Sequence, residues 1–122
     1  MGGFRELKVW QLGKMLAVEV YRITQSDLFR KDFSLKDQIR RAAVSIPSNI
    51  AEGDERGSNR EAVRFFYIAK GSLAEVQTQL EIAYEIGYLK KDILETMENK
   101  CSTIGKMLGS LIKARSPKNP NL

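Results

Sequence analysis

Residues 58–87 read "SNREAVRFFYIAKGSLAEVQTQLEIAYEIG", and this stretch decides the fold class. Its apolar residues recur at alternating steps of three and four, which places them on one face of an α-helix. Ser58 and Glu61 have the spacing of a capping box, which satisfies amide donors of the first turn. Gly87 suits a helix end because glycine adopts a left-handed conformation without strain. The pattern predicts a long amphipathic helix with the buried positions Ala62, Phe66, Ala69, Leu73, Val76, Leu80 and Ala83.

The same periodicity appears near both ends of the chain. In residues 4–25 the apolar stripe is Val9, Leu12, Leu16, Val20 and Ile23, and in residues 94–111 it is Leu94, Met97, Cys101, Ile104, Leu108 and Leu111. The first of these helices has a wide apolar arc, because Leu7, Trp10, Ala17 and Tyr21 lie beside its stripe. We therefore expect two partners for it, one inside the bundle and one from another chain.

A fourth helix is predicted from Ser34 to Gly53, just before residues 58–87. Ser34 is the expected N-cap, with Asp37 three residues later, and Gly53 is expected to close the helix in a left-handed conformation before the turn "GDERG". Pro47 lies inside this helix, where it frees the carbonyl of Ala43 and predicts a kink near residues 43–47. Two short helices would also fit, but the unbroken apolar stripe of the segment favours one bent helix.

Two polar residues of this helix need a structural explanation. Asn49 falls at the edge of the apolar face, where an unpaired amide would be costly. We expect it to bond backbone groups in the turn of residues 53–58, or groups of an adjacent subunit. Glu52 continues the polar stripe of Arg41, Ser45 and Ser48, and we interpret it as a second residue that fixes the turn.

No segment alternates with period two, so the sequence offers no strands. Four amphipathic helices with short loops predict an all-α fold, an antiparallel up-down-up-down four-helix bundle. We expect one domain over residues 1–115 and a flexible tail over residues 116–122, because Pro117 and Pro120 break helices.

Composition narrows the possible functions. The chain has 122 residues, 43% of them hydrophobic, and its 20 Lys and Arg against 15 Asp and Glu give a net charge of +5. A moderate positive charge permits anionic partners. Neither a membrane-spanning segment nor a signal peptide is evident, so we expect a cytoplasmic protein without a membrane partner.

The residues needed for common catalytic chemistry are missing. The sequence has no His, and Cys101 stands on an apolar helix position, where a thiol is usually a small core residue. Glu81 and Glu85, four residues apart, are typical of a solvated helix face. "EGDERG" lacks the lysine of a phosphate-binding loop. We therefore expect a non-enzymatic protein with neither metal nor cofactor.

Basic residues near the predicted turn suggest a different activity. Arg56, Arg60 and Arg64 fall in the turn and the first two turns of the following helix, and we expect Arg40 and Arg41 to approach from the preceding helix. Guanidinium groups near a helix N-terminus suit phosphates, because fixed charge and free amides both attract anions. The alternative is that these arginines pair with Asp54, Glu55 and Glu61 or cross a subunit interface.

Two stretches carry a family resemblance. "RRAAVSIPSNIAEG" at residues 40–53 and "GSLAE" at residues 71–75 resemble the S23-type four-helix bundle proteins encoded in intervening sequences of bacterial 23S ribosomal RNA genes. The similarity runs from Phe4 to about Ala114. It implies a homopentameric ring and kinship with the accessory variability determinant of diversity-generating retroelements, a basic pentamer that binds nucleic acid and a reverse transcriptase.

Matched residue by residue, the resemblance covers the polar positions Arg40, Arg41, Ser45, Asn49, Glu52, Gly53, Arg56, Gly71, Ser72 and Glu75. The chain departs from the family at "LFRKDF", where a proline often follows the first Phe, and at Lys70, which stands where an arginine is common and keeps its charge. The basic residues near the turn and the matched basic positions together give the expected nucleic-acid-binding residues Arg40, Arg41, Arg56, Arg60, Arg64 and Lys70. Two functions stay open: an oligomer that binds RNA or DNA backbones, or a protein-interaction scaffold without a nucleic-acid role.

Overall fold

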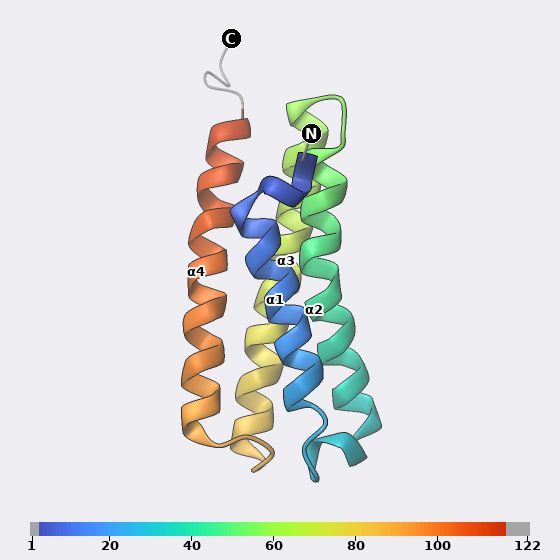
Figure 1. The fold of residues 1–122 in the computed structure, drawn as a ribbon, viewed down its shortest axis with the longest axis vertical. Helices are drawn as coiled ribbons and strands as arrows, with labels where there is room; N and C mark the ends of the chain where they lie inside the picture. Colours follow the sequence, from blue (N-terminus) through green and yellow to red (C-terminus); the bar gives the residue numbers. More distant parts are fainter. Residues whose placement is uncertain (1–2, 117–122) are drawn as a thin grey trace.

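Four long helices and two short 3₁₀ helices make up the fold (Figure 1). The computed structural model describes residues 3–116, which contain no strand. In chain order the elements are η1 (Gly3–Glu6), α1 (Lys8–Ile23), η2 (Phe29–Lys31), α2 (Phe33–Asp54), α3 (Asn59–Glu85) and α4 (Lys91–Arg115). The all-α prediction with four helices is confirmed. Except for Ser116, the predicted tail lies outside the described residues.

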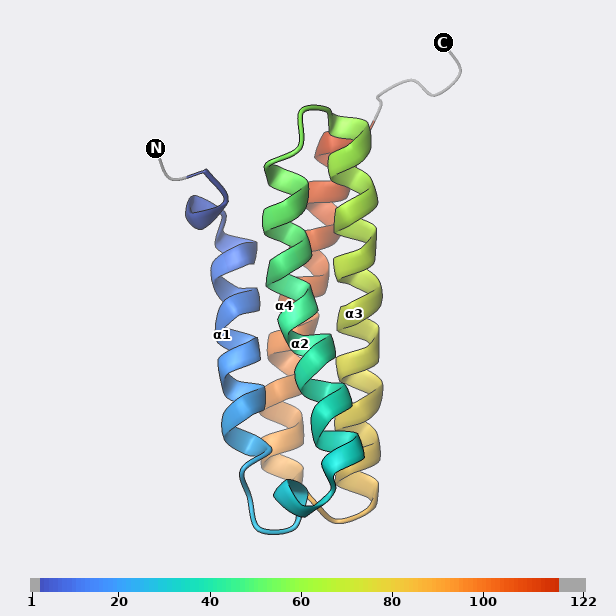
Figure 2. The ribbon, with the colours of Figure 1, turned by 90° about the vertical axis from the view of Figure 1, so that its right-hand side faces the viewer.

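The four long helices lie side by side around one apolar core. Figures 1 and 2 show α1 and α3 running one way along the long axis and α2 and α4 running the other way. Each of the four contributes buried apolar residues to that core. Near the end of α4 the buried residue is Ile112, one position after Leu111, which was the predicted residue of the stripe and is only partly buried. None of the described helices is long and apolar enough to cross a membrane.

The ends of α3 form as predicted. The hydroxyl of Ser58 accepts a hydrogen bond from the amide of Glu61 at 3.2 Å. At the other end Gly87 has φ +87°, and the amide of Tyr88 donates to the carbonyl of Ala83 at 2.8 Å. This bond, with that from the Gly87 amide to the Tyr84 carbonyl, makes a Schellman cap.

The start of α2 differs from the prediction. Asp32 is the N-cap, because its carboxylate accepts a hydrogen bond from the amide of Leu35 at 3.0 Å, and Ser34 lies within the helix. The Tyr88 hydroxyl donates to the same carboxylate at 2.9 Å. The Leu35 amide and then the Tyr88 hydroxyl lower the pKa of Asp32. Asp32 thus joins the loop before α2 to the loop before α4.

Gly53 does not close α2 in a left-handed conformation, so that prediction was wrong. It is a buried residue inside the helix, and the positive-φ glycines of the described chain are Gly3 and Gly87. A Cβ at Gly53 would lie 2.7 Å from Cε1 of Phe66 and 2.9 Å from the carbonyl oxygen of Ala62. Glycine is needed here because α3 passes too close for any side chain.

Pro47 lies within one continuous helix, so the alternative of two short helices is wrong. Its ring is buried on the side of α2 that faces α1. A Cβ at Gly13 of α1 would lie 3.7 Å from Cβ of Pro47 and 3.4 Å from Cγ2 of Ile46. A methyl group at position 13 would thus meet both side chains at ordinary van der Waals distance. The kink near residues 43–47 stays a prediction.

We predict that Gly53→Ala destabilises the protein by about 1–3 kcal/mol, because the added methyl group overpacks the contact with Phe66 and Ala62. Gly71→Ala is the matched control. A Cβ at Gly71 meets nothing within 4 Å, so this change should be neutral or stabilising by up to about 1 kcal/mol through helix propensity. Urea unfolding followed by circular dichroism measures both. Equal effects of the two substitutions would contradict the close-contact role of Gly53.

Candidate nucleic-acid interface

Three of the predicted arginines gather where α2 ends and α3 begins. Arg56 follows the end of α2, Arg60 is in the first turn of α3, and Arg64 is one turn further along; all three are exposed. Tyr67, whose exposed fraction is 56%, comes three residues after Arg64. We call Arg56, Arg60 and Arg64 the arginine end.

These arginines differ in their contacts. The guanidinium of Arg56 is 3.4 Å from the carboxylate of Glu52 and lies over the ring of Phe65, 4.6 Å from its centroid. Arg60 and Arg64 form no ion pair with any residue between 3 and 116. The alternative that these arginines pair with Asp54, Glu55 and Glu61 is therefore not seen within the described chain, where two of the three guanidinium groups have no ion pair.

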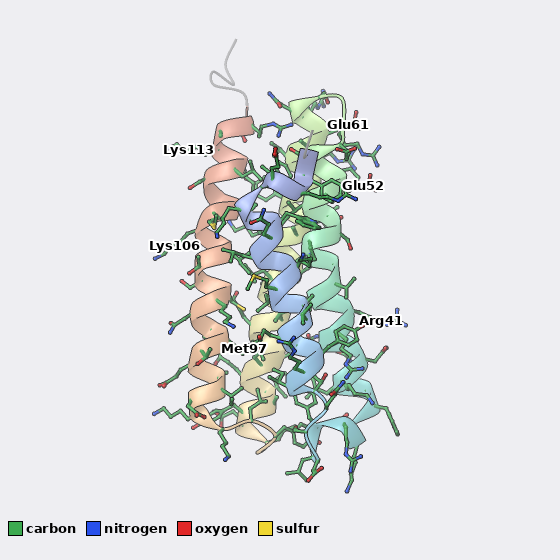
Figure 3. The ribbon with its side chains drawn as sticks, viewed as in Figure 1. Arg41, Glu52, Glu61, Met97, Lys106 and Lys113 are labelled. Carbon is green, nitrogen blue, oxygen red and sulfur yellow. The ribbon has the colours of Figure 1, made fainter. Side chains whose placement is uncertain are left out.

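Arg40 and Arg41 do not approach the arginine end, so that expectation was wrong. Arg41 lies roughly four helical turns, or about 22 Å, from Arg56 along α2. Figure 3 shows Arg41 well down the bundle from Glu52 and Glu61. The two arginine groups of the α2 segment therefore lie apart along the bundle.

Both residues also have local contacts. Nε of Arg40 donates to the hydroxyl of Thr24 at 2.8 Å, and its guanidinium lies 4.4 Å from the centroid of the Tyr21 ring. Arg40 thereby ties the end of α1 to α2. Arg41 pairs with Asp37 at 2.9 Å, one turn earlier on the same helix. Lys70 is exposed further along α3.

Asn49 has partners inside α2. Its Nδ2 donates to the carbonyl oxygen of Ser45 at 2.8 Å and to the Ser45 hydroxyl at 2.9 Å. The hydroxyl of Ser72 on α3 donates to the same Ser45 oxygen at 2.8 Å. The expected bonds from Asn49 to the turn of residues 53–58 are absent from the described structure. Asn49 instead belongs to a polar contact between α2 and α3. Glu52 contacts the turn by pairing with Arg56.

The matched family positions meet in space at this contact. Arg41 and Ser45 of α2 line a shallow groove of about 240 Å³ with Ser72 and Glu75 of α3. Gln79 lines the same groove, and its Oε1 is buried without a hydrogen-bond partner in the described chain. Sequence reasoning named four of these five residues but did not place them together.

Arg115 is a residue of this region that sequence reasoning missed. Its Nε donates to the side-chain oxygen of Asn59 at 2.6 Å, and its guanidinium is 3.6 Å from the carboxylate of Asp54. It also lies 5.8 Å from the centroid of Phe66. A basic residue in the last turn of a helix was the only signal in the sequence. Arg115 holds α4 against the α2–α3 turn and takes up the charge of Asp54.

Cys101 is fully buried, as expected of a core residue. Burial raises the pKa of its thiol to about 11, with repulsion from Glu98 as the smaller cause. A thiol that is both inaccessible and protonated is a poor nucleophile. Within residues 3–116 no three His, Cys, Asp or Glu side chains are grouped to hold a metal ion.

Comparisons with known proteins point to one family. The model of the family described as 23S rRNA-intervening sequence protein matches residues 5–110. No curated protein matches the sequence. The crystal structure of a protein with unknown function from the S23 ribosomal protein family of Bacteroides thetaiotaomicron is similar, with a TM-score of 0.79 and 27% sequence identity. The alignment covers 86% of this chain and 98% of that one.

We predict that Cys101 of the folded protein resists alkylation by iodoacetamide at pH 8, because the raised pKa keeps the thiol protonated up to about pH 10 and the core excludes the reagent. In denaturant the same thiol should react at the rate of free cysteine. Mass spectrometry of timed samples measures the modified fraction. Rapid labelling of the native protein would show that the thiol is accessible.

Proposed function

Since this chain belongs to the 23S rRNA-intervening sequence protein family, we propose that it is a non-enzymatic cytoplasmic protein that binds the phosphate backbone of RNA or DNA. The family match identifies the kind of protein but supplies no activity. The argument for binding therefore rests on the charges of this chain and on where its fold puts them.

The observation that carries the proposal is the exposure of Arg60 and Arg64 without an ion pair. Both are exposed, and neither pairs with an acidic residue of the described chain. Of the nearby acids, Glu52 and Asp54 are engaged by Arg56 and Arg115, whereas Glu55 and Glu61 are exposed and form no ion pair with described residues. These two carboxylates reduce the field of Arg60 and Arg64, but both guanidinium groups stay open to phosphate oxygens from solvent.

Helix geometry adds to this charge. Arg60 lies in the first turn of α3, where helical amides lack carbonyl partners and the helix dipole is positive. Ser58 caps the amide of Glu61. Phosphate oxygens accept from both amides and guanidinium groups, and arginine can bind them through two parallel hydrogen bonds. Backbone contacts of this type position a nucleic acid without reading its sequence.

Assembly would enlarge the basic surface. We propose that the antiparallel bundle forms a homopentameric ring, as the family resemblance implies. Two free arginines per subunit are few for stable nucleic-acid binding, but a ring repeats them five times on one face. Exposed apolar residues on α1, Met15, Val18 and Tyr21, support a second partner for this helix.

A protein-interaction scaffold is the second candidate. It is favoured by the contacts of Arg40 with Thr24 and of Arg56 with the ring of Phe65, through which arginines of this chain link neighbouring helices. In that function Arg60 and Arg64 would pair with acidic groups of a partner protein. The family resemblance implies a reverse transcriptase as one such partner. The following experiment separates the two candidates.

We predict that the protein binds mixed-sequence RNA or DNA with an affinity that falls steeply as salt rises. Each phosphate contact contributes about −0.7 to −0.9 to the slope of log K against log salt. Arg60→Gln/Arg64→Gln should flatten that slope by about 1.4–1.8 per subunit engaged and weaken binding at low salt. Fluorescence anisotropy of a labelled oligonucleotide, measured over a salt series, provides the slope.

The matched control is Lys90→Gln/Lys91→Gln, which removes the same charge at the opposite end of the bundle, at the start of α4. It should leave the slope unchanged. Circular dichroism and light scattering must show that both variants keep their fold and mass. Absence of binding by the wild-type protein at low salt would overturn the proposal and favour the scaffold, whereas dissociation of the arginine variant would assign these residues to a subunit interface.

A further inference from the structure

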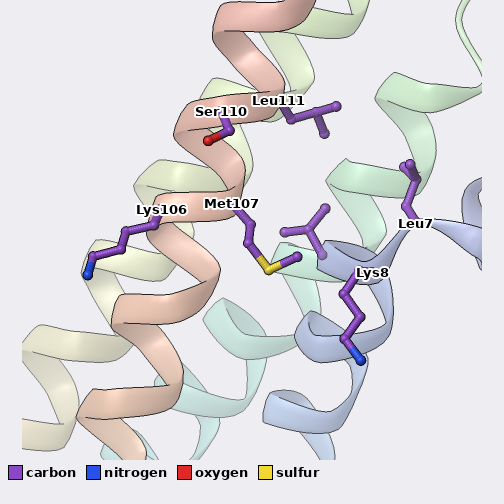
Figure 4. A pocket seen from close by; sticks show the side chains of 7 residues that line it. Leu7, Lys8, Lys106, Met107, Ser110 and Leu111 are labelled. Atoms are coloured by element: carbon purple, nitrogen blue, oxygen red, sulfur yellow. The ribbon is translucent and has the colours of Figure 1, made fainter.

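A groove with an apolar lining runs between α1 and α4. Near the start of α1 it opens into a cavity of about 430 Å³, in which Leu7 faces Met107 and Leu111 of α4 (Figure 4). A second cavity of about 150 Å³ continues it, lined by Leu12 and Ile104 among others. Ile104 is a buried core residue, whereas the partly buried Leu7, Leu12, Met107 and Leu111 pack against the core from its edge.

The lengths of the two helices explain the groove. α1 has 16 residues and α4 has 25, so α4 extends about 13 Å beyond what α1 can cover. The short helix η1 packs against α1 and α2 instead (Figure 1), and of the residues before α1 it is Leu7 that lines the groove. The apolar stripe of α4 therefore lacks a full partner at this end of the subunit.

Lysines border the groove. Lys8 of α1 and Lys106 of α4 line its wider part, both are exposed, and neither forms an ion pair with a residue of the described chain (Figure 4). Lys100 lines the second cavity and is 3.9 Å from Glu19. An apolar lining between unpaired lysines fits a helix that presents apolar and acidic side chains together.

The outer face of α3 presents such a surface. Ile68, Ile82 and Ile86 have exposed fractions of 50%, 45% and 50%. Glu75 falls between them at the seven-residue spacing that keeps side chains on one face, and Glu85 borders them. Both carboxylates are exposed and form no ion pair with described residues. We call these five residues the α3 stripe.

We propose that the α1–α4 groove of one subunit receives the α3 stripe of a second copy of this chain. The isoleucines would cover the apolar lining, and Glu75 and Glu85 would meet Lys8 and Lys106. The contact joins two different surfaces, so it is heterologous, and its repetition closes a ring when the rotation between copies allows. This inference rests on the ring in the proposed function and gives that ring its interface.

Charge reversal tests this pairing. Lys8→Glu/Lys106→Glu and Glu75→Lys/Glu85→Lys should each weaken self-association by about tenfold or more, because like charges then face each other. The variant that combines all four substitutions restores opposite charges and should recover the wild-type assembly. The control is Lys90→Glu/Lys91→Glu at the start of α4, which should not change the assembly. Sedimentation velocity over a concentration series measures the masses, and circular dichroism confirms the fold.

Each outcome decides a separate point. If both double variants keep the wild-type mass, or if the fourfold variant stays dissociated, the proposed interface is wrong. A wild-type protein that stays a monomer at high concentration overturns the interface and the ring together. Nucleic-acid binding is measured on the same samples with the labelled oligonucleotide. Salt-dependent binding that persists in a charge-reversed but dissociated variant shows that the backbone-binding proposal stands by itself.

Discussion

The close approach of α2 and α3 at Gly53 is the constraint on which the rest of the structure depends. Phe66 and the backbone of Ala62 occupy the space that any side chain at Gly53 would need. Because the helices touch here, the turn between them is short, and Arg56 comes next to the first turn of α3. The same contact fixes the register that pairs Ser45 with Ser72 further along the two helices. The arginine end and the polar groove thus follow from one missing side chain.

Much of the fold could be predicted because the relevant signals lie within single helices. The periodicity and both caps of α3 are local features, and Ser58 and Gly87 act as the sequence indicates. Gly53 was assigned a wrong role because the sequence does not distinguish a glycine that caps a helix from one against which a second helix packs closely. The N-cap of α2 was misplaced because Asp32 and Ser34 are both good caps, and only Tyr88, from a distant loop, favours Asp32.

The candidate site was less predictable for the same physical reason. Whether an arginine has a polar partner depends on residues that are far away in the sequence. Thr24 accepts a hydrogen bond from Arg40, and Arg115 pairs with Asp54, which the other arginines could otherwise have bound. A helical wheel shows which residues share a face of one helix but not how far apart they lie along it. Arg41 and Arg56 therefore seemed close in the sequence pattern and are separated in the bundle. The family resemblance named the matched residues without indicating which of them meet.

The contact of Arg115 with Asn59 has a consequence for the order in which the protein takes shape during synthesis. The two residues are 56 positions apart, so the ribosome needs roughly 3–11 s to make the chain between them. During that interval α2 and α3 can pair, while Asp54 has no guanidinium from α4 beside it and is free to attract Arg56, Arg60 or Arg64. Only the arrival of the last helical turn removes this competing acid. Asp54 therefore gains its guanidinium partner only when the last turn of α4 packs against the α2–α3 turn.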